Sequence, residues 1–143
     1  MVGNLKKYKN LFIEKFSENI SMIQAQLPKL ISGSFQSADL DPLIRIFHNI
    51  KSDAGIMEYR SIAVISGRAE ALLKSGKDRT QKSSAAPEDL TSQLNLIGEV
   101  AEFFRQICRE DILEMGEQAA ERLTLALEQA IDSENTDYSN GAV

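Results

Sequence analysis

The stretch DPLIRIFHNIKSDAGIM, residues 41–57, carries a clear helical pattern together with an unusual group of polar and small side chains. Its apolar residues recur at three- and four-residue steps, which is the spacing of one buried face of an α-helix. Asp41 can cap the free amides of the first turn, and Pro42 suits the first helical position. The residues on the predicted buried face are Leu43, Phe47, Ile50, Ala54 and Met57.

The same periodicity continues on both sides of this stretch, and no sustained alternation of apolar and polar residues indicates a strand. The sequence predicts a first helix over about residues 5–27, which Pro28 kinks or ends because proline lacks a backbone donor. A turn near residues 58–60 leads to a third helix, and two more follow from Pro87 and from about Asp111. The predicted inward-facing residues of these four helices are Tyr8, Phe12, Phe16, Ile20, Ile23 and Leu27; Ile62, Ile65, Ala69 and Leu72; Leu90, Leu94, Ile97, Ala101, Phe104 and Cys108; and Ile112, Met115, Ala119, Leu123 and Ala126.

The segments between these helices are polar and lack an apolar period. SGSFQSAD (residues 32–39) and KSGKDRTQKSSAAPED (residues 74–89) are predicted as surface loops. No glycine or proline marks the junction between the last two helices, so one long bent helix is an open alternative. We expect residues 1–133 to form the helical domain and residues 134–143 to form a flexible tail or linker.

Amphipathic helices joined by short connections bury their apolar faces against one another and run antiparallel to their neighbours. The predicted fold class is therefore all-α, an up-and-down four-helix bundle with an additional C-terminal helix. The residues predicted to share its core are Phe12, Phe16, Phe47, Ile50, Ile62, Ile65, Leu94, Ile97 and Phe104.

Composition excludes several classes of function. The 143 residues are 43% hydrophobic and 26% charged, which is the profile of one folded domain rather than of a disordered chain. A net charge of −5 disfavours nucleic acid as a partner. The single cysteine, Cys108, cannot form an internal disulfide and suggests a reducing compartment. No apolar run is long enough to span a membrane and the N-terminus lacks a secretory pattern, so we expect a cytoplasmic protein.

His48 is the only histidine in the chain, and it lies off the predicted buried face of its helix. Helical spacing places it on a second, exposed face with Ile44, Lys51, Ser52 and Gly55. Glycine inside a helix costs about 1 kcal/mol relative to alanine, so Gly55 indicates a place where another molecule approaches closely. A single histidine makes neither a metal site nor a catalytic triad, but a neutral exposed imidazole can act as a nucleophile toward phosphorus. Lys51 would then offset part of the phosphate charge.

This stretch resembles the histidine-containing phosphotransfer (HPt) family, whose pattern has the form H-x-x-K-G-x-[AS] with a further glycine four positions later. His48, Lys51 and Ala54 match this pattern. The lead-in LIRIF and the following SIAVISGRAEALL also fit the family. The first helix, LFIEKFSENISMIQAQL, looks like the opening helix of the phosphotransfer domain in chemotaxis-type histidine kinases. The resemblance covers about residues 5–110.

Two positions depart from the family pattern. Ser52 replaces the glycine after the lysine, and Glu58 replaces the later glycine at the turn after the helix. Serine is small enough to keep the surface accessible to a partner. The loss of the second glycine, in contrast, can change the geometry of the turn. Chemotaxis kinases often have a second histidine and a glutamate on the next helix. Here Glu70 can keep the acidic position, but no second histidine exists.

The resemblance implies a phosphocarrier without its own ATP site and without a cofactor or bound metal. His48 would be the phosphoacceptor, and Lys51 would act on the phosphate electrostatically. Ile44, Ser52 and Gly55 would line the partner surface for a histidine kinase catalytic domain and a response-regulator receiver domain. A further alternative is that the chain is the N-terminal module of a histidine kinase. The alternative from another class is a degenerate member, a helical interaction or dimerisation module that takes no phosphate.

Overall fold

The computed structural model describes the backbone of residues 2–32, 35–83, 90–110 and 117–141, and the side chains of residues 6–32, 35–81, 90–109 and 120–132. Within these ranges the chain is all-helical, as predicted, and contains no strand. No described helix combines the length and apolarity needed to cross a membrane. In chain order the elements are α1 (Val2–Ser32), the short 3₁₀ helix η1 (Ser37–Leu40), α2 (Asp41–Ile56), α3 (Arg60–Ser83), α4 (Thr91–Glu110) and α5 (Glu117–Gly141).

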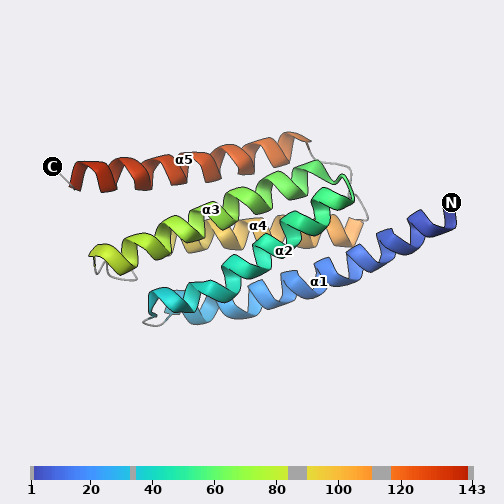
Figure 1. Ribbon diagram of the computed structural model, residues 1–143, viewed down its shortest axis with the longest axis horizontal. Coiled ribbons are helices and arrows are strands. Elements are labelled where there is room, and N and C mark those ends of the chain that lie inside the picture. The colour runs from blue at the N-terminus through green and yellow to red at the C-terminus, as the bar shows by residue number, and fades with distance from the viewer. Residues whose placement is uncertain (1, 33–34, 84–89, 111–116, 142–143) are drawn as a thin grey trace.

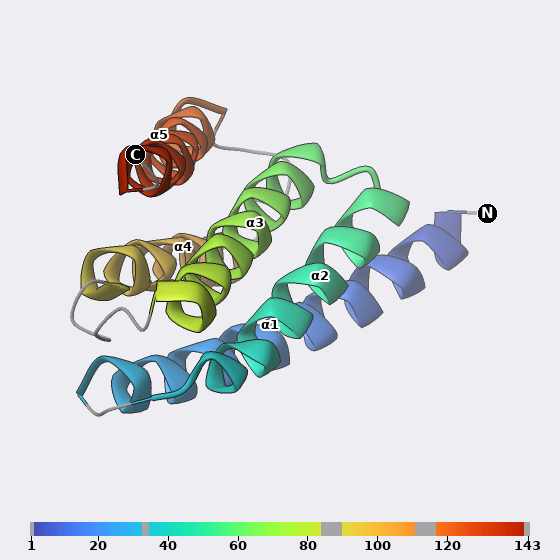
Figure 2. The ribbon, with the colours of Figure 1, turned by 60° about the vertical axis from the view of Figure 1, so that its left-hand side comes forward.

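The helices pack side by side, and consecutive helices run in opposite directions across the view of Figure 1. α2 packs against both α1 and α3, and α4 packs against both α1 and α3, so these four helices enclose a common interior (Figure 2). α5 lies outside this group and packs mainly on α3. α4 and α5 are separate helices in opposite directions, so the alternative of one long bent helix is wrong.

The predicted core is confirmed, because every residue that we expected there is buried. Phe16 packs against Phe12 and Phe104 with ring centroids 5.2 and 5.1 Å apart, which joins α1 to α4. The inward position predicted for Tyr8 is wrong, since 57% of this residue is exposed on the early turns of α1. The buried residues of the core are Phe12, Phe16, Phe47, Ile50, Ile62, Ile65, Leu94, Ile97 and Phe104, with further apolar residues around them.

The C-terminal inward positions are only partly as predicted. Leu123 is buried, but Ala126 is half-buried and Leu127 next to it is fully buried. Cys108 is also half-buried, and this burial raises the pKa of its thiol, an effect that the charge of Arg105 opposes. The side chains predicted inward at 112, 115 and 119 lie outside the described residues.

Two predicted boundaries are wrong because tertiary packing extends the helices. α1 continues through Pro28 to Ser32, and the packing of Leu27 and Leu30 in the core holds this last turn in place. α3 continues to Ser83, through much of the segment predicted as a loop. There Lys77 Nζ lies 2.6 Å from an Asp41 carboxylate oxygen, so a charged contact joins this polar part of α3 to the start of α2.

The start of α2 differs by one position from the prediction. η1 runs directly into α2, so Leu40 takes the N-cap position and Asp41 and Pro42 form the first turn. η1 also replaces the end of the loop predicted over residues 32–39. α5 reaches Gly141, so the backbone of most of the segment predicted as a tail is helical. The division of the chain into a domain and a linker stays a prediction.

α2 ends in a turn that contains Glu58, the residue at the position of the second glycine in the family pattern. The amide of Tyr59 donates to the carbonyl of Ala54 at 2.9 Å, and the amide of Glu58 donates to that of Gly55 at 3.1 Å. These two bonds define a Schellman ending, in which the residue in the position of Glu58 adopts the left-handed conformation. Glu58 does so with φ = 63°, so the turn keeps the geometry that glycine favours.

We therefore expect Glu58→Gly to stabilise the domain. A left-handed conformation costs a non-glycine residue about 1–2 kcal/mol, and glycine avoids this cost. The greater backbone entropy of glycine in the unfolded chain offsets part of the resulting stabilisation. The free energy of unfolding should rise by about 1 kcal/mol, measured by urea denaturation. Glu58→Ala is the matched control, because alanine removes the same charge but keeps the Cβ atom. Equal stabilisation by glycine and alanine would contradict the strain argument.

Candidate functional site

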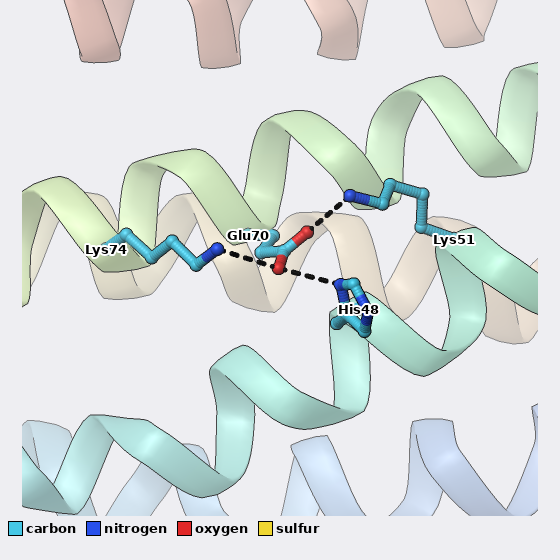
Figure 3. A network of polar contacts seen from close by, with 4 residues as sticks. All are labelled: His48, Lys51, Glu70 and Lys74. Carbon is cyan, nitrogen blue, oxygen red and sulfur yellow. Dashed lines mark hydrogen bonds and ion pairs between the residues drawn. The ribbon is translucent and has the colours of Figure 1, made fainter.

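His48 stands on the face of α2 that is directed toward α3, and 54% of its side chain is exposed. Its Nδ1 atom lies 3.0 Å from Glu70 Oε2 on α3 (Figure 3). Nε2, the other ring nitrogen, makes no hydrogen bond with the described residues. The predicted surface position of His48 is therefore correct, and one edge of its ring is held by the neighbouring helix.

Glu70 is the centre of a polar network that joins α2 to α3. Only 6% of its side chain is exposed, and three nitrogens surround its carboxylate. Lys51 Nζ donates to Oε1 at 2.8 Å, while Lys74 Nζ lies 3.1 Å from Oε2, the oxygen that also contacts His48. Burial raises the pKa of the Glu70 carboxyl, but the hydrogen bonds and charges of Lys51 and Lys74 outweigh burial, so the net pKa lies below its ordinary value.

The charge of Glu70 decides the state of the imidazole. An ionised carboxylate only accepts hydrogen bonds, so His48 Nδ1 must carry the hydrogen that it shares with Oε2. In the neutral ring the lone pair then lies on Nε2, at the edge that the described residues leave open. The fold thus presents a nucleophilic nitrogen in a fixed orientation, supported from behind by a buried anion.

Comparison with known families identifies the family of the chain. The family model of the Hpt domain matches residues 7–103. The chain belongs to the Hpt domain family. No curated protein and no solved structure matches it. The matched range includes His48, Lys51 and Glu70, whereas α5 lies beyond it.

The other predicted site residues of this Hpt domain occupy different environments. Ser52 is exposed one turn from His48. Gly55 is exposed too, and an added Cβ atom there would meet nothing within 4 Å. Ile44 is half-buried and packs against the core, so it presents less surface than Ser52 and Gly55. Among the described residues, no group of three or more His, Cys, Asp or Glu side chains could hold a metal ion.

A close approach to a glycine does occur in this Hpt domain, but at Gly67 rather than at Gly55. A Cβ atom on Gly67 would lie 3.2 Å from Lys51 Cδ. The missing side chain therefore leaves room for the stem of Lys51 to cross α3 and reach Glu70. Sequence reasoning missed this role, although a glycine inside the predicted third helix carried the same signal as Gly55.

Sequence reasoning also missed Lys74. Its signal was available, because Glu70 and Lys74 are separated by four residues, the spacing at which a glutamate and a lysine meet on one helix face. The prediction of a loop from residue 74 onward hid that relation, since the spacing has meaning only where the helix continues. Lys74 completes the network in Figure 3.

Proposed function

We propose that this Hpt domain is a histidine phosphocarrier in two-component signalling, in which His48 accepts a phosphoryl group and passes it to an aspartate of a receiver domain. The observation that carries the proposal is the contact between the exposed imidazole of His48 and the buried carboxylate of Glu70, 3.0 Å apart. Family membership supports it, since Hpt domains are phosphotransfer modules of such systems.

The acceptance step needs one nucleophile and one leaving group. The lone pair of His48 Nε2 attacks the phosphorus atom of the donor and forms an N–P bond. The bond from phosphorus to the leaving oxygen breaks, and its electron pair departs with ADP or another leaving group. The ring becomes positively charged, and Glu70 stabilises that charge through the hydrogen on Nδ1. Lys51, held beside the ring, offsets part of the phosphate charge.

Transfer onward reverses the bond changes on the imidazole. A carboxylate oxygen of the receiver aspartate attacks phosphorus, the N–P bond breaks, and its electron pair returns to Nε2. The kinase catalytic domain supplies ATP and the receiver supplies the acceptor. Neither step therefore requires this domain to bind a nucleotide. Ser52 and Gly55 form the open surface over which these partners approach. The domain is thus a carrier and not a complete enzyme.

The proposal includes the bundle architecture, the type of Hpt domain and its partners. α1–α4 would be the up-and-down four-helix bundle of a phosphotransfer domain, with α5 as the additional helix. The helix order and the acidic position at Glu70 favour the chemotaxis type, working in the cytoplasm with a histidine kinase in the same chain or in another one. Two-component partners, rather than nucleic acid or membrane, fit the acidic charge and the site.

The direct test is phosphorylation of the wild-type domain by a histidine kinase catalytic domain with radiolabelled ATP, or by labelled acetyl phosphate. We expect one phosphoryl group per chain, in a linkage that is labile to acid and stable to alkali, as a phosphohistidine requires. If no kinase and no small phosphodonor labels the domain, the phosphocarrier function is wrong and a helical interaction module takes its place.

A second arm tests the partner surface. Gly55→Trp adds a large side chain where the structure has open space, so the fold and His48 stay intact. This variant should still accept label from acetyl phosphate but should transfer it to a receiver at least tenfold more slowly. Asn95→Trp, at an exposed position of α4, is the matched control. Equal transfer rates for both variants would show that receivers do not approach over Gly55.

A further inference from the structure

One oxygen atom of Glu70 serves two donors. Oε2 lies 3.0 Å from His48 Nδ1 and 3.1 Å from Lys74 Nζ, while the only partner of Oε1 among the described residues is Lys51 Nζ. Each donor contact draws on the same negative charge, so the lysine weakens the hydrogen bond that the imidazole can make with Oε2. Removal of Lys74 from Oε2 would leave that oxygen entirely to His48.

The two lysines differ in their freedom to move. Lys51 crosses α3 at Gly67 with its Cδ atom close to the glycine, and this packing holds the stem in place. Lys74 is 61% exposed, and its one polar contact with the described residues is the one to Glu70. Of the two cations on the carboxylate, Lys74 is therefore the one that can turn away.

The charge balance of the site favours such a movement once phosphate is present. At rest the network holds one carboxylate and two ammonium groups beside the imidazole, so its net charge is positive. A phosphoryl group adds a charge close to −2. It attracts an ammonium group more strongly than the Glu70 carboxylate does, because the carboxylate carries one charge and already has a second cation beside it. Lys74 Nζ and His48 Nδ1 contact the same oxygen, so the ammonium group starts close to the imidazole that would carry the phosphoryl group.

We propose that Lys74 is a second phosphate-facing cation, which leaves Glu70 Oε2 for the phosphoryl group on His48 and thereby releases that oxygen to His48 Nδ1. The inference rests on the proposed phosphocarrier function and adds to it a residue outside the H-x-x-K pattern. Lys74 stabilises the phosphorylated state directly, as a counter-ion of the phosphoryl group. Its departure also removes the weakening that it imposes at rest on the hydrogen bond from the ring to Glu70, so the shared oxygen does not oppose the movement.

The test measures the phosphorylation equilibrium of the full chain with a histidine kinase catalytic domain at a fixed ratio of ATP to ADP. Lys74→Gln should lower the ratio of phosphorylated to unphosphorylated domain two- to fivefold, the range that contacts of exposed charges support. Lys74→Arg should restore most of the loss, because it keeps the charge. Raising the salt concentration should shrink the difference between Lys74→Gln and wild type, since salt screens exposed charges.

Lys77→Gln is the matched control, because Lys77 lies on the same helix but pairs with Asp41. We expect it to leave the equilibrium unchanged, and circular dichroism should show the same helix content for all variants. If wild type takes no label, the phosphocarrier function and the role of Lys74 both fall. If wild type is labelled but Lys74→Gln reaches the wild-type ratio, or the control loses as much, only the role of Lys74 falls.

Discussion

His48→Gln should abolish phosphoryl acceptance and leave the domain folded. His48 is the only imidazole in the chain, so no second histidine can take its place as the phosphoacceptor. Its side chain is more than half exposed, and its removal opens no cavity in the core. Glu70 keeps Lys51 and Lys74 as partners, so the buried carboxylate is not left unpaired. The free energy of unfolding should change by no more than about 0.5 kcal/mol.

The measurement is label transfer from a kinase or from acetyl phosphate, with urea denaturation on the same samples. Asn49→Gln introduces the same side chain one position along α2, also at an exposed site, and should be labelled like wild type. Label on the His48→Gln variant would place the phosphoryl group on another residue. A large loss of stability in that variant would instead make His48 a structural residue of the α2–α3 interface.

Phe47→Ala should produce the largest change in stability, a loss of about 3–5 kcal/mol. Phe47 is fully buried, although it is the neighbour of His48 in the chain. Truncation removes most of its apolar surface and leaves a cavity between closely packed helices, which relaxes only in part. Since the free energy of unfolding of such domains is about 5–15 kcal/mol, the variant should lose a large share of its stability.

Urea denaturation at 25 °C measures this loss as a shift of the midpoint at constant slope. Tyr8→Ala is the matched control, because it removes an aromatic ring of similar size from an exposed position and should change stability by no more than about 0.5 kcal/mol. An unchanged midpoint for Phe47→Ala, or equal losses for both variants, would contradict the assignment of Phe47 to the core.

The comparison of Phe47 with His48 shows what periodicity can predict. Adjacent residues on a helix point 100° apart, so the apolar spacing alone placed Phe47 inside and His48 outside. Burial of apolar faces dominates the fold, and their positions are visible in the order of residues. The helices, their core and the surface position of the imidazole therefore follow from the sequence by itself.

Where a helix carries charged side chains in place of a regular apolar stripe, the same reasoning failed. The end of α3 is polar, so periodicity predicted a loop where the structure has Lys74 paired with Glu70 and Lys77 paired with Asp41. In the second pair the partner, Asp41, lies on another helix, α2, and no local pattern specifies such a neighbour. Glu58 shows the converse, since backbone hydrogen bonds at the end of α2 hold a left-handed residue where the sequence offers no glycine.

The sequence by itself determined that one nucleophilic imidazole stands on an amphipathic helix beside a lysine. Only the tertiary structure decided what lies behind that imidazole, namely a buried carboxylate on α3 that is kept ionised by two lysines. The physical reason is that burial of a charge is costly unless opposite charges surround it. The partners that meet this cost at Glu70 include His48 and Lys51, some twenty residues away in the chain, which only the packing of α2 against α3 brings together.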